Sequence, residues 1–353
     1  MGKMMKAAVQ EKPKQLVIKE VPVPEISDDE VLIKVAYTGI CGTDWSIFTG
    51  KYSADQLPLI PGHEFSGHIE KTGKNAVNLQ EGDPVTADIN MSCGHCFYCR
   101  RGQKLMCPEF TQLGIHIDGT YAEYVKAPWQ QVHKLPDSVP LLTGAYVEPL
   151  SCVIHSAKAV QIEMGSSIAI LGTGLGIPYG LLARHLGATT VMLLGRNETK
   201  LEIARQMGVQ HVVNIKDVGD PIAYVKDMTE GRGADVVVEM VGTTDTYEQT
   251  WEMVRPGGTL AAFGITGPED VMKLKPFDVV LGERKIVGSC AGVGNDWSDS
   301  IQFLSSGVID PQPLFSMIVP LEELEGALHE LKENPKLTKV FVSADILKRQ
   351  ILG

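Results

Sequence analysis

The chain has 353 residues, which is too long for a single hydrophobic core of ordinary size and predicts two domains. Apolar residues make up 44% and charged residues 21%, a composition that excludes a disordered or fibrous chain. The 43 acidic residues outnumber the 32 basic residues, and the resulting formal charge of −11 argues against nucleic acid or an anionic membrane as a partner.

The N-terminal segment, residues 1–10, lacks the long apolar core of a signal peptide, and the chain contains no run of eighteen apolar residues that could span a membrane. The seven cysteines are an odd number, and four of them fall within fifteen residues, which fits metal ligation better than a disulfide scaffold. We therefore expect a cytoplasmic protein without a membrane partner.

Short β-type runs broken by Gly and Pro fill the chain to about residue 145, and no long helical pattern separates them. The clearest runs are residues 16–18, 30–36, 65–71, 83–87 and 121–125. This rhythm predicts an antiparallel β domain, built as a barrel or as a sandwich.

Candidate ligands of a catalytic metal lie in this first part. Cys41, in Gly-Ile-Cys-Gly-Thr-Asp, and His63 with Glu64, in Pro-Gly-His-Glu, are each expected at a strand end beside Gly, where the backbone leaves room for a metal. A catalytic zinc takes three protein ligands and keeps one position open. Glu148 is the best candidate for the third ligand; Cys152, one helical turn later, is the alternative, although its apolar neighbours favour a packed thiol.

Four closely spaced cysteines predict a structural zinc site: Cys93, Cys96, Cys99 and Cys107. Two-residue gaps let a tight loop direct successive thiolates at one point, and the longer gap brings the chain back for the fourth corner of a tetrahedron. His95 is expected to be a loop residue, because four thiolates already complete the shell. Two alternatives to zinc are open: an iron–sulfur cluster, which uses the same four ligands, and four free buried cysteines that bind no metal.

From about residue 150 buried strands alternate with helices, which predicts a parallel sheet with helices on both faces. Strands are expected at 167–171, 190–194, 211–214, 236–240 and 259–263, and helices at 178–186 and 198–207. Turns are expected at Gly208, at Gly231 and at the Pro-Gly-Gly sequence 256–258. After a run at 285–289, helices are expected at 298–305 and 321–333, with a closing strand at 339–342.

A glycine turn follows the first of these strands. Gly172 permits the tight turn, and Gly174 with Leu175 lets the backbone approach a pyrophosphate at the N-terminus of the next helix. The dinucleotide fingerprint expects its third glycine where Ile177 stands, whereas Gly176 comes one residue early. We therefore expect a dinucleotide site in which the start of the helix is reshaped.

The end of the second strand bears on the choice of cofactor. It carries no acidic residue that would bind the ribose 2′-OH of NAD. Gly195 leaves space there, and Arg196 offers a charged fork for a 2′-phosphate. We therefore favour NADP over NAD, with Asn197 and Lys200 as further cofactor residues; the alternative is that Arg196 is an ordinary exposed turn residue.

These motifs together resemble the zinc-containing medium-chain alcohol dehydrogenases, above all the branch of sorbitol, polyol and threonine dehydrogenases. The most specific part is the Gly-His-Glu sequence at 62–64 followed by Gly67, Gly73 and Ala76, which is similar to the zinc signature of the family. The cysteine quartet, the Glu-Pro-Leu sequence at 148–150 and the glycine turn follow in the order of the family. The resemblance covers nearly the whole chain.

The resemblance implies an α/β protein with three regions. Residues 1–149 would form a GroES-like β-barrel catalytic domain, and residues 150–287 a Rossmann domain with a doubly wound parallel sheet. Residues 288–353 would return to the catalytic domain, and the cleft between the domains would hold the substrate.

The resemblance also implies the roles of individual residues. Cys41, His63 and Glu148 would bind the catalytic zinc, Glu64 would be a neighbouring or exchanging ligand, and Thr43 would relay the alcohol proton. The implied reaction is hydride transfer between NADP(H) or NAD(H) and a polyol, a sugar, or a small secondary alcohol or ketone, with threonine as an alternative substrate. Two zinc ions per chain and a homodimer or homotetramer are implied as well.

Some features leave the prediction open. Ser46 stands where many relatives place a relay histidine, so the route of the proton is not given. Phe48, Tyr52 and Trp297 are candidates for the substrate pocket, although packing is the simpler expectation for each. The rival functions are a zinc-free quinone or enone reductase, which needs no metal ligands, and a non-catalytic NADPH-binding protein, which has no need of Thr43.

Overall fold

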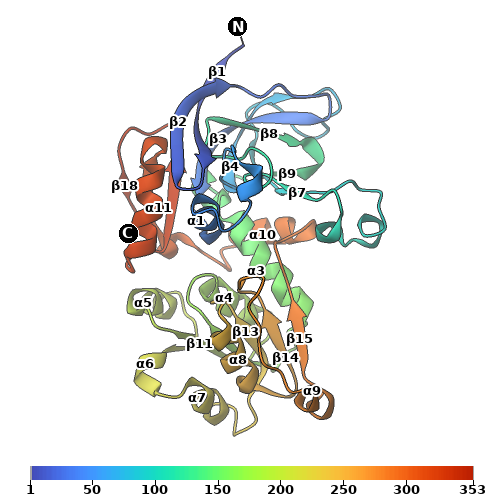
Figure 1. The fold of residues 1–353 in the computed structure, drawn as a ribbon, viewed down its shortest axis with the longest axis vertical. Helices are drawn as coiled ribbons and strands as arrows, with labels where there is room; N and C mark the ends of the chain where they lie inside the picture. Colours follow the sequence, from blue (N-terminus) through green and yellow to red (C-terminus); the bar gives the residue numbers. More distant parts are fainter. Residues whose placement is uncertain (1, 353) are drawn as a thin grey trace. The chain divides into compact units, whose positions relative to one another are not determined.

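The computed structural model describes residues 2–352, which form two compact units (Figure 1). One unit combines Met1–Pro149 with Val293–Gly353, and the other is Leu150–Gly292. Helix α3 (Val147–Val160) begins in the first unit and continues into the second. No helix in the described part of the chain is long and apolar enough to cross a membrane.

An eight-stranded sheet is the framework of the first unit, in the order β18-β16-β17-β3-β4-β5-β9, with β8 paired to β3. Its strands are β3 (Glu30–Gly39), β4 (Glu64–Thr72), β5 (Pro84–Ala87), β8 (Tyr124–Pro128), β9 (Val132–Lys134), β16 (Phe315–Pro320), β17 (Lys339–Ser343) and β18 (Gln350–Ile351). Strand β17 runs antiparallel to β3, with Phe341 opposite Gly39. The last part of the chain therefore joins the sheet directly beside the strand that leads to Cys41.

Two hairpins complete the β structure of the first unit: β1 (Met4–Lys12) with β2 (Gln15–Pro22), and β6 (Asn90–Met91) with β7 (Thr111–Gln112). The sequence analysis missed β1, in which a charged C-terminal end follows a buried centre, Ala7 to Val9. This centre packs in one core with Leu324 and Leu328 of helix α11 (Leu324–Glu333), and Figure 1 shows α11 beside β2. The contact is invisible in a local pattern because it joins the two ends of the chain.

The helices of the first unit are short. They are α1 (Gly42–Phe48), α2 (Leu141–Gly144), α10 (Asn295–Ser305) and α11, with single turns η1 (Ala54–Gln56), η2 (Cys99–Arg101), η3 (Lys104–Met106), η4 (Trp129–Gln131), η5 (Gln312–Leu314) and η6 (Leu321–Glu323). The helix expected at 321–333 is thus a turn, η6, followed by α11. The helix expected at 298–305 begins three residues earlier, at Asn295.

A six-stranded parallel sheet forms the second unit, in the order β12-β11-β10-β13-β14-β15. Its strands are β10 (Ser167–Leu171), β11 (Thr190–Gly195), β12 (His211–Asn214), β13 (Ala234–Glu239), β14 (Val254–Ala262) and β15 (Lys285–Gly288). Its helices are α4 (Gly176–His185), α5 (Glu198–Gln206), α6 (Ile215–Val218), α7 (Pro221–Asp227), α8 (Thr244–Met253) and α9 (Pro276–Gly282). Counted from β10 the strand order is 3-2-1-4-5-6, the doubly wound arrangement of dinucleotide-binding folds.

The central strands of this sheet are buried because their apolar runs are unbroken. Side chains of β10, β11 and β13 are almost inaccessible on both faces, as expected for a parallel sheet covered by helices. One expected turn is wrong: the Pro-Gly-Gly sequence at 256–258 lies inside β14, where the pairing with β13 shifts register. A β-bulge accommodates the extra residues without ending the strand.

Candidate functional site

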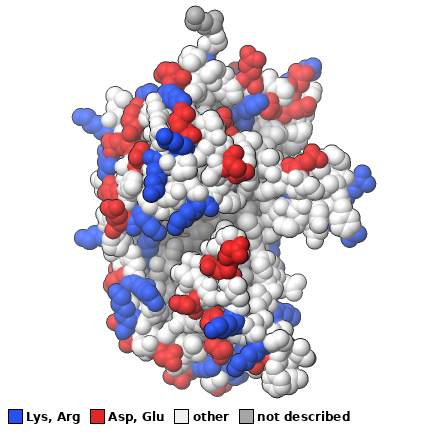
Figure 2. Space-filling model, in the orientation of Figure 1, with Lys and Arg blue, Asp and Glu red and all other residues white. Residues whose placement is uncertain are grey.

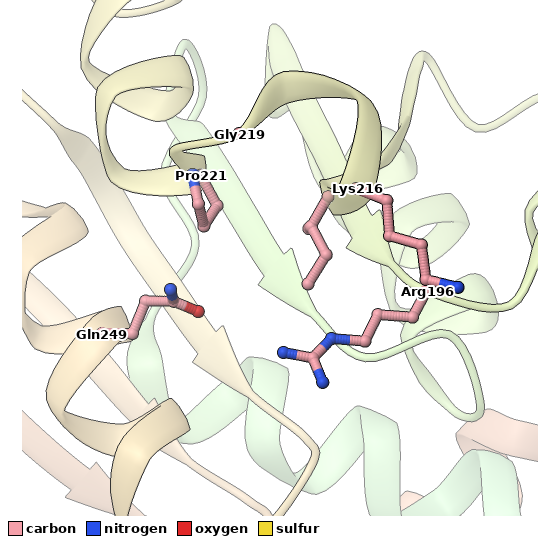
Figure 3. Close-up of a pocket in the computed structure, with 6 residues that line it drawn as sticks. Arg196, Lys216, Gly219, Pro221 and Gln249 are labelled. Atoms are coloured by element: carbon pink, nitrogen blue, oxygen red, sulfur yellow. The ribbon is translucent and has the colours of Figure 1, made fainter.

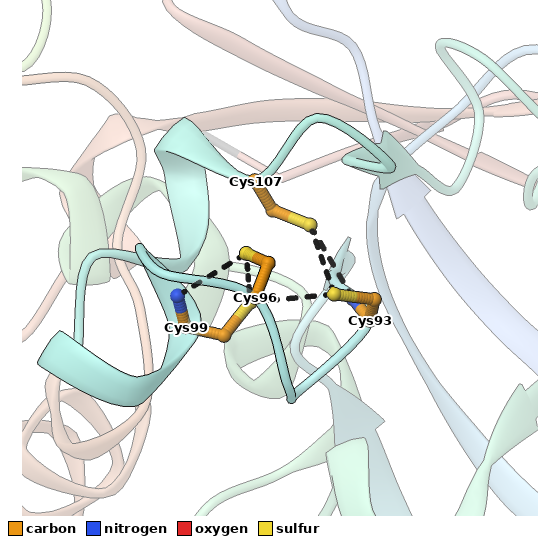
Figure 4. A group of neighbouring side chains, drawn as sticks. All are labelled: Cys93, Cys96, Cys99 and Cys107. Atoms are coloured by element: carbon orange, nitrogen blue, oxygen red, sulfur yellow. Dashed lines mark hydrogen bonds between the residues drawn. The ribbon is translucent and has the colours of Figure 1, made fainter.

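The four cysteines of the quartet converge on one point in the structure (Figure 4). Their Sγ atoms lie 3.5 Å apart for Cys96 and Cys99, 3.6 Å for Cys93 and Cys107, and 4.0 Å for Cys93 and Cys99. A tetrahedral ion with Zn–S bonds of about 2.3 Å places its sulfur atoms about 3.8 Å apart, so the quartet fits a single zinc ion. The thiols are too far apart for disulfide bonds.

Backbone geometry supports thiolates at these positions. The N–H groups of Cys99 and Glu109 donate to the Sγ atoms of Cys96 and Cys107, at 3.5 Å and 3.4 Å. A hydrogen bond from the Ser92 side chain is the main cause that lowers the pKa of Cys99 to about 6. Backbone hydrogen bonds lower the pKa of Cys107, but burial and the side-chain hydrogen bonds of Cys93 and Cys99 outweigh them and raise it to about 11, so the four thiols are not equivalent without a metal. A bound cation stabilises the thiolate form of all its cysteine ligands.

The loop that carries the quartet is tied to the barrel by a second contact. The Lys104 ammonium, on turn η3, forms an ion pair with the fully buried carboxylate of Asp88, which also accepts a hydrogen bond from the backbone N–H of Gly294 at 3.2 Å. Asp88 thus connects the cysteine loop with the segment that returns from the second unit.

Cys41, His63 and Glu64 form a second group of candidate ligands, whose donor atoms lie within 4.8 Å of one another. Cys41 follows β3 and is the N-cap of α1, while Glu64 opens β4 opposite Gly39. Antiparallel pairing of β3 with β4 therefore brings together residues more than twenty positions apart in the sequence. His63 and Glu64 are buried and Cys41 is partly exposed.

Asp44 organises this group and was not predicted as a site residue. Its Oδ2 accepts hydrogen bonds from the Cys41 backbone N–H and the Tyr121 hydroxyl, both at 2.8 Å, and its Oδ1 lies 3.5 Å from His63 Nδ1. Burial opposes a charge on His63, but the carboxylate of Asp44 raises the pKa of the imidazole well above its usual value. With Nδ1 directed at Asp44, Nε2 is the nitrogen available to a metal. A sequence signal existed, since Asp44 lies at the third position of a helix capped by Cys41.

Lys339 is the second residue of the site that the sequence analysis did not identify. It lies at the start of β17, and its ammonium forms an ion pair with Glu64 and donates to the Ile40 carbonyl at 3.0 Å. Burial opposes a charge on this lysine, but the Glu64 carboxylate and Cys41 raise its pKa. No local signal marks Lys339, because the partner is 275 positions away in the sequence.

The remaining predicted residues of the metal site do not join this group of donor atoms. Glu148 is buried near the start of α3 and acts electrostatically on Lys339, but among the described residues it does not belong to the compact group of donor atoms; neither does Cys152. Thr43 follows Cys41 on α1 and is partly exposed. The Ser46 hydroxyl donates to the Gly42 carbonyl at 3.4 Å, within the same helix.

The glycine turn after β10 has the geometry of a nucleotide cradle. Gly172 has a φ of +124°, a backbone conformation open mainly to glycine, and a Cβ on Gly174 would meet nothing within 4 Å among the described residues. A Cβ on Gly176 would lie 3.0 Å from side-chain atoms of both Ile170 and Leu193. Gly176 therefore already provides the close helix–sheet packing expected of the third glycine, and α4 begins at that residue.

The end of β11 differs from expectation in one respect. A Cβ on Gly195 would overlap the methyl group of Thr173, so the space beside this glycine is filled by the turn rather than left open for a phosphate. Asn197 caps α5 by accepting a hydrogen bond from the Lys200 N–H at 3.2 Å. Burial lowers the pKa of the Lys200 side chain.

A surface pocket of about 270 Å³ lies beside Arg196 (Figure 3). Ile215 and Lys216 of α6, Gly219, Pro221 and Gln249 complete its lining. The guanidinium of Arg196 and the amide of Gln249 extend into it from opposite sides. A pocket with an apolar wall and with a cation and an amide at its rim suits a flat heterocycle that carries an anionic group. Among the lining residues, the sequence analysis identified only Arg196.

The three candidates for a substrate pocket lie in different environments. Phe48 is buried and packs on Trp45 and His329, and Trp297 is fully buried and stacks on His133. Tyr52 is exposed. Packing therefore accounts for Phe48 and Trp297.

Charges are mixed on one face of the molecule. In Figure 2, basic and acidic side chains are interspersed on the face drawn, over both units. This face does not carry the continuous basic patch typical of a nucleic-acid-binding surface.

Comparison with known proteins identifies relatives along the whole chain. The family model of the alcohol dehydrogenase GroES-like domain matches residues 27–137, and that of the zinc-binding dehydrogenases matches residues 174–306. Sorbitol dehydrogenase of Bacillus subtilis (strain 168) is 34% identical over 333 residues, 92% of each chain. D-arabitol-phosphate dehydrogenase of Enterococcus avium is 30% identical over 351 residues, 98% of this chain and 99% of the relative.

A solved structure is similar over almost the same length. It is described as a zinc-binding dehydrogenase from Sinorhizobium meliloti 1021 and was determined with bound NADP. The two structures superpose with a TM-score of 0.90 at 32% identity, covering 97% of this chain and 99% of that chain.

Proposed function

The chain belongs to the zinc-type medium-chain alcohol dehydrogenase family, and from this premise we propose that it is an NADP-dependent dehydrogenase of polyols, sugars or small secondary alcohols. The predicted combination of a GroES-like domain with a Rossmann sheet is confirmed by the family models and the similar structure. The observation that carries the proposal is the convergence of Cys41, His63 and Glu64 on one buried point, with Asp44 behind the histidine.

Two zinc ions per chain are part of the proposal. The quartet would hold a structural ion, since four thiolates fill its shell. Cys41, His63 and Glu148 would hold the catalytic ion, with Glu64 as a neighbouring carboxylate. The two ligand groups favour this function over a zinc-free quinone or enone reductase, which needs no metal ligands. The thiols of the quartet form no disulfide bonds, which suits a reducing, cytoplasmic compartment.

The residues in and around the Cys41–His63–Glu64 group, called the open site below, have different roles in the proposed reaction. When bound there, zinc supplies the Lewis-acid character that lowers the pKa of an alcohol, and NADP accepts the hydride. Asp44, whose Oδ1 lies 3.5 Å from His63 Nδ1, would fix the tautomer and orientation of the imidazole by approaching it more closely when the metal is bound. Thr43, two residues after Cys41, would take the alcohol proton and pass it on.

The cofactor preference for NADP has three supports. Strand β11 ends without a carboxylate, the Arg196 guanidinium extends into a pocket of the second unit, and Lys216 lines the same pocket. A guanidinium is suited to a phosphate ester, whereas the hydroxyls of an unmodified ribose need an acceptor such as Asp or Glu. The pocket would take the adenosine end of the cofactor, and Arg196 its 2′-phosphate.

A substrate screen with metal analysis tests the proposal. Purified protein is expected to contain two zinc ions per chain and to oxidise at least one member of a panel of polyols, sugar acids, threonine and 2-butanol, faster with NADP than with NAD. Cys41→Ser is expected to lose one zinc ion and all turnover while keeping the fold. Undiminished turnover after removal of both metals would refute the proposal, as would an absence of dehydrogenase activity with every alcohol at full zinc occupancy.

A further inference from the structure

A further group of possible metal ligands lies beside the cysteine quartet. Cys93, His95 and Glu109 carry donor atoms that lie within 4.8 Å of one another. His95 and Glu109 are exposed and Cys93 is partly exposed, so a cation can reach the group from solvent. A tetrahedral zinc ion places sulfur, nitrogen and oxygen ligands about 3.3–3.6 Å apart. Small rotations of the two exposed side chains are therefore enough for the three residues to meet one ion.

The His95 imidazole is already oriented for a metal. Its Nδ1 lies 2.8 Å from the Cys93 carbonyl oxygen, which can only accept a hydrogen bond. Nδ1 therefore carries the proton, and Nε2 keeps the lone pair that a metal needs. A backbone carbonyl is a usual partner for the second nitrogen of a metal-binding histidine. Gly94, with a φ of +78°, makes the turn that allows this contact between residues two positions apart.

The backbone of Glu109 is tied to the quartet. Its N–H donates to the Sγ atom of Cys107 at 3.4 Å. Two basic side chains of the same loop have other partners, since Lys104 pairs with Asp88 and the Arg101 guanidinium lies over an aromatic ring. The Glu109 carboxylate is therefore available to a cation that approaches the loop from solvent.

Cys93 can serve both groups of ligands. When the quartet holds its ion, the Cys93 side chain is a thiolate, and its sulfur keeps further lone pairs with which it can bridge to a second cation. A thiolate, an imidazole and a carboxylate together suit zinc. Three protein ligands leave the fourth position to water, so an ion bound here exchanges with solvent.

We propose that Cys93, His95 and Glu109 form an additional, exchangeable zinc site on the surface of the cysteine loop, which shares the Cys93 sulfur with the structural ion. The inference rests on the structural ion of the proposed function and is independent of the open site. The additional site is expected to bind zinc more weakly than the quartet, because it has one protein ligand fewer and because two exposed side chains lose rotamer freedom on binding.

Zinc uptake by the zinc-loaded protein tests the proposal. Protein freed of loosely bound metal is expected to hold two zinc ions per chain and to take up one more when zinc is added at micromolar concentration. Glu109→Gln and His95→Asn are expected to lose this uptake and to keep both tightly bound ions; the asparagine retains an N–H for the Cys93 carbonyl. Glu81→Gln and His68→Ala, which change an exposed carboxylate and an exposed imidazole elsewhere, are the matched controls. Uptake that neither loop variant lowers, or that the controls lower equally, would show zinc scattered over the surface and overturn the proposal.

Cobalt added to the zinc-loaded protein tests whether Cys93 is shared. Co²⁺ bound to a thiolate has a sulfur-to-metal charge-transfer band in the near ultraviolet, whereas Co²⁺ bound only to nitrogen and oxygen has none. The wild type is expected to gain this band at an unchanged zinc content, and Glu109→Gln is expected not to gain it. A bound cobalt ion without the band would show that Cys93 is not a ligand and would overturn the shared site. A band that grows only as zinc is displaced would place the cobalt in the quartet and count against the proposal as well.

The same measurements distinguish this inference from the proposed function. A protein that holds no metal at the quartet would refute the structural ion, and the inference with it. A protein with two tightly bound ions, dehydrogenase activity and no further uptake would refute the inference alone. Uptake of the additional ion by a protein that is inactive toward every alcohol would refute the proposed function and support the additional site.

Discussion

Asp44 is the side chain on which the geometry of the open site depends most. One carboxylate fixes the backbone at Cys41, accepts from Tyr121 and faces His63. Asp44→Asn is expected to weaken zinc binding at the open site by about 10- to 100-fold, because a neutral amide orients the imidazole less well. Chelator competition measures the change, with Tyr121→Phe as the control that removes one donor only. Equal affinities of Asp44→Asn and the wild type would contradict this role.

Arg196 is the residue that we expect to decide the cofactor. Arg196→Ala is expected to lower kcat/KM for NADP by about 10- to 100-fold, since hydrogen bonds to a charged group contribute about 1.5–3 kcal/mol. The value for NAD is expected to change little. Steady-state kinetics with both cofactors provide the measurement, and Arg232→Ala, an exposed arginine of the same unit paired with Glu230, is the matched control. A parallel loss for NADP and NAD would show that Arg196 does not read the 2′-phosphate.

At the scale of elements, two glycines of the turn between β10 and α4 are expected to have different roles, one in NADPH binding and the other in the stability of the fold. Gly174 has open space where a Cβ would stand among the described residues, whereas a Cβ on Gly176 would press on Ile170 and Leu193 at 3.0 Å. Gly174→Ala is expected to weaken NADPH binding at an unchanged melting temperature. Gly176→Ala is expected to lower the free energy of unfolding by roughly 1–3 kcal/mol through overpacking. Thermal unfolding and fluorescence titration with NADPH check both, and the reverse assignment of the two effects would contradict the structure.

The cysteine loop is an element that we expect to depend on its metal. Cys107→Ser is expected to remove one zinc ion per chain and to raise hydrogen exchange across η2 and η3, because the metal is bound only in the folded loop. Zinc at the open site is expected to remain, since it uses separate ligands. Cys290→Ser, which alters an exposed cysteine outside both groups, is the control. Loss of both zinc ions in Cys107→Ser would mean that the two sites are not independent.

For the molecule as a whole, the sequence predicted those features that depend on residues close together in the chain. The buried runs of β10, β11 and β13 and the close spacing of the quartet were legible because each depends on neighbours in sequence. Lys339 was not, because its role arises from the pairing of β17 with β3 beside β4. Asp44 has a local contact with Cys41 that the sequence could have indicated, whereas its contacts with Tyr121 and His63 depend on the fold. The close approach of Gly176 to Ile170 and Leu193 was not predicted either, because it depends on how α4, which begins at Gly176, packs on β10 and β11.

The surface of the second unit bears on assembly, which we propose to be a homodimer or homotetramer. Strand β15 ends the sheet, with no neighbour on its outer side in the described residues, and Phe277, Val280 and Leu281 of the adjacent α9 are each 70% exposed. An open strand edge beside exposed apolar side chains favours association. Leu281→Glu is therefore expected to shift the protein toward monomers in sedimentation velocity, whereas Met164→Glu, at a residue 90% exposed elsewhere in the unit, leaves the mass unchanged. A wild-type protein that is monomeric at micromolar concentration would show that this surface serves another purpose. A monomeric Leu281→Glu that retains both zinc ions would place assembly and metal binding in separate parts of the fold.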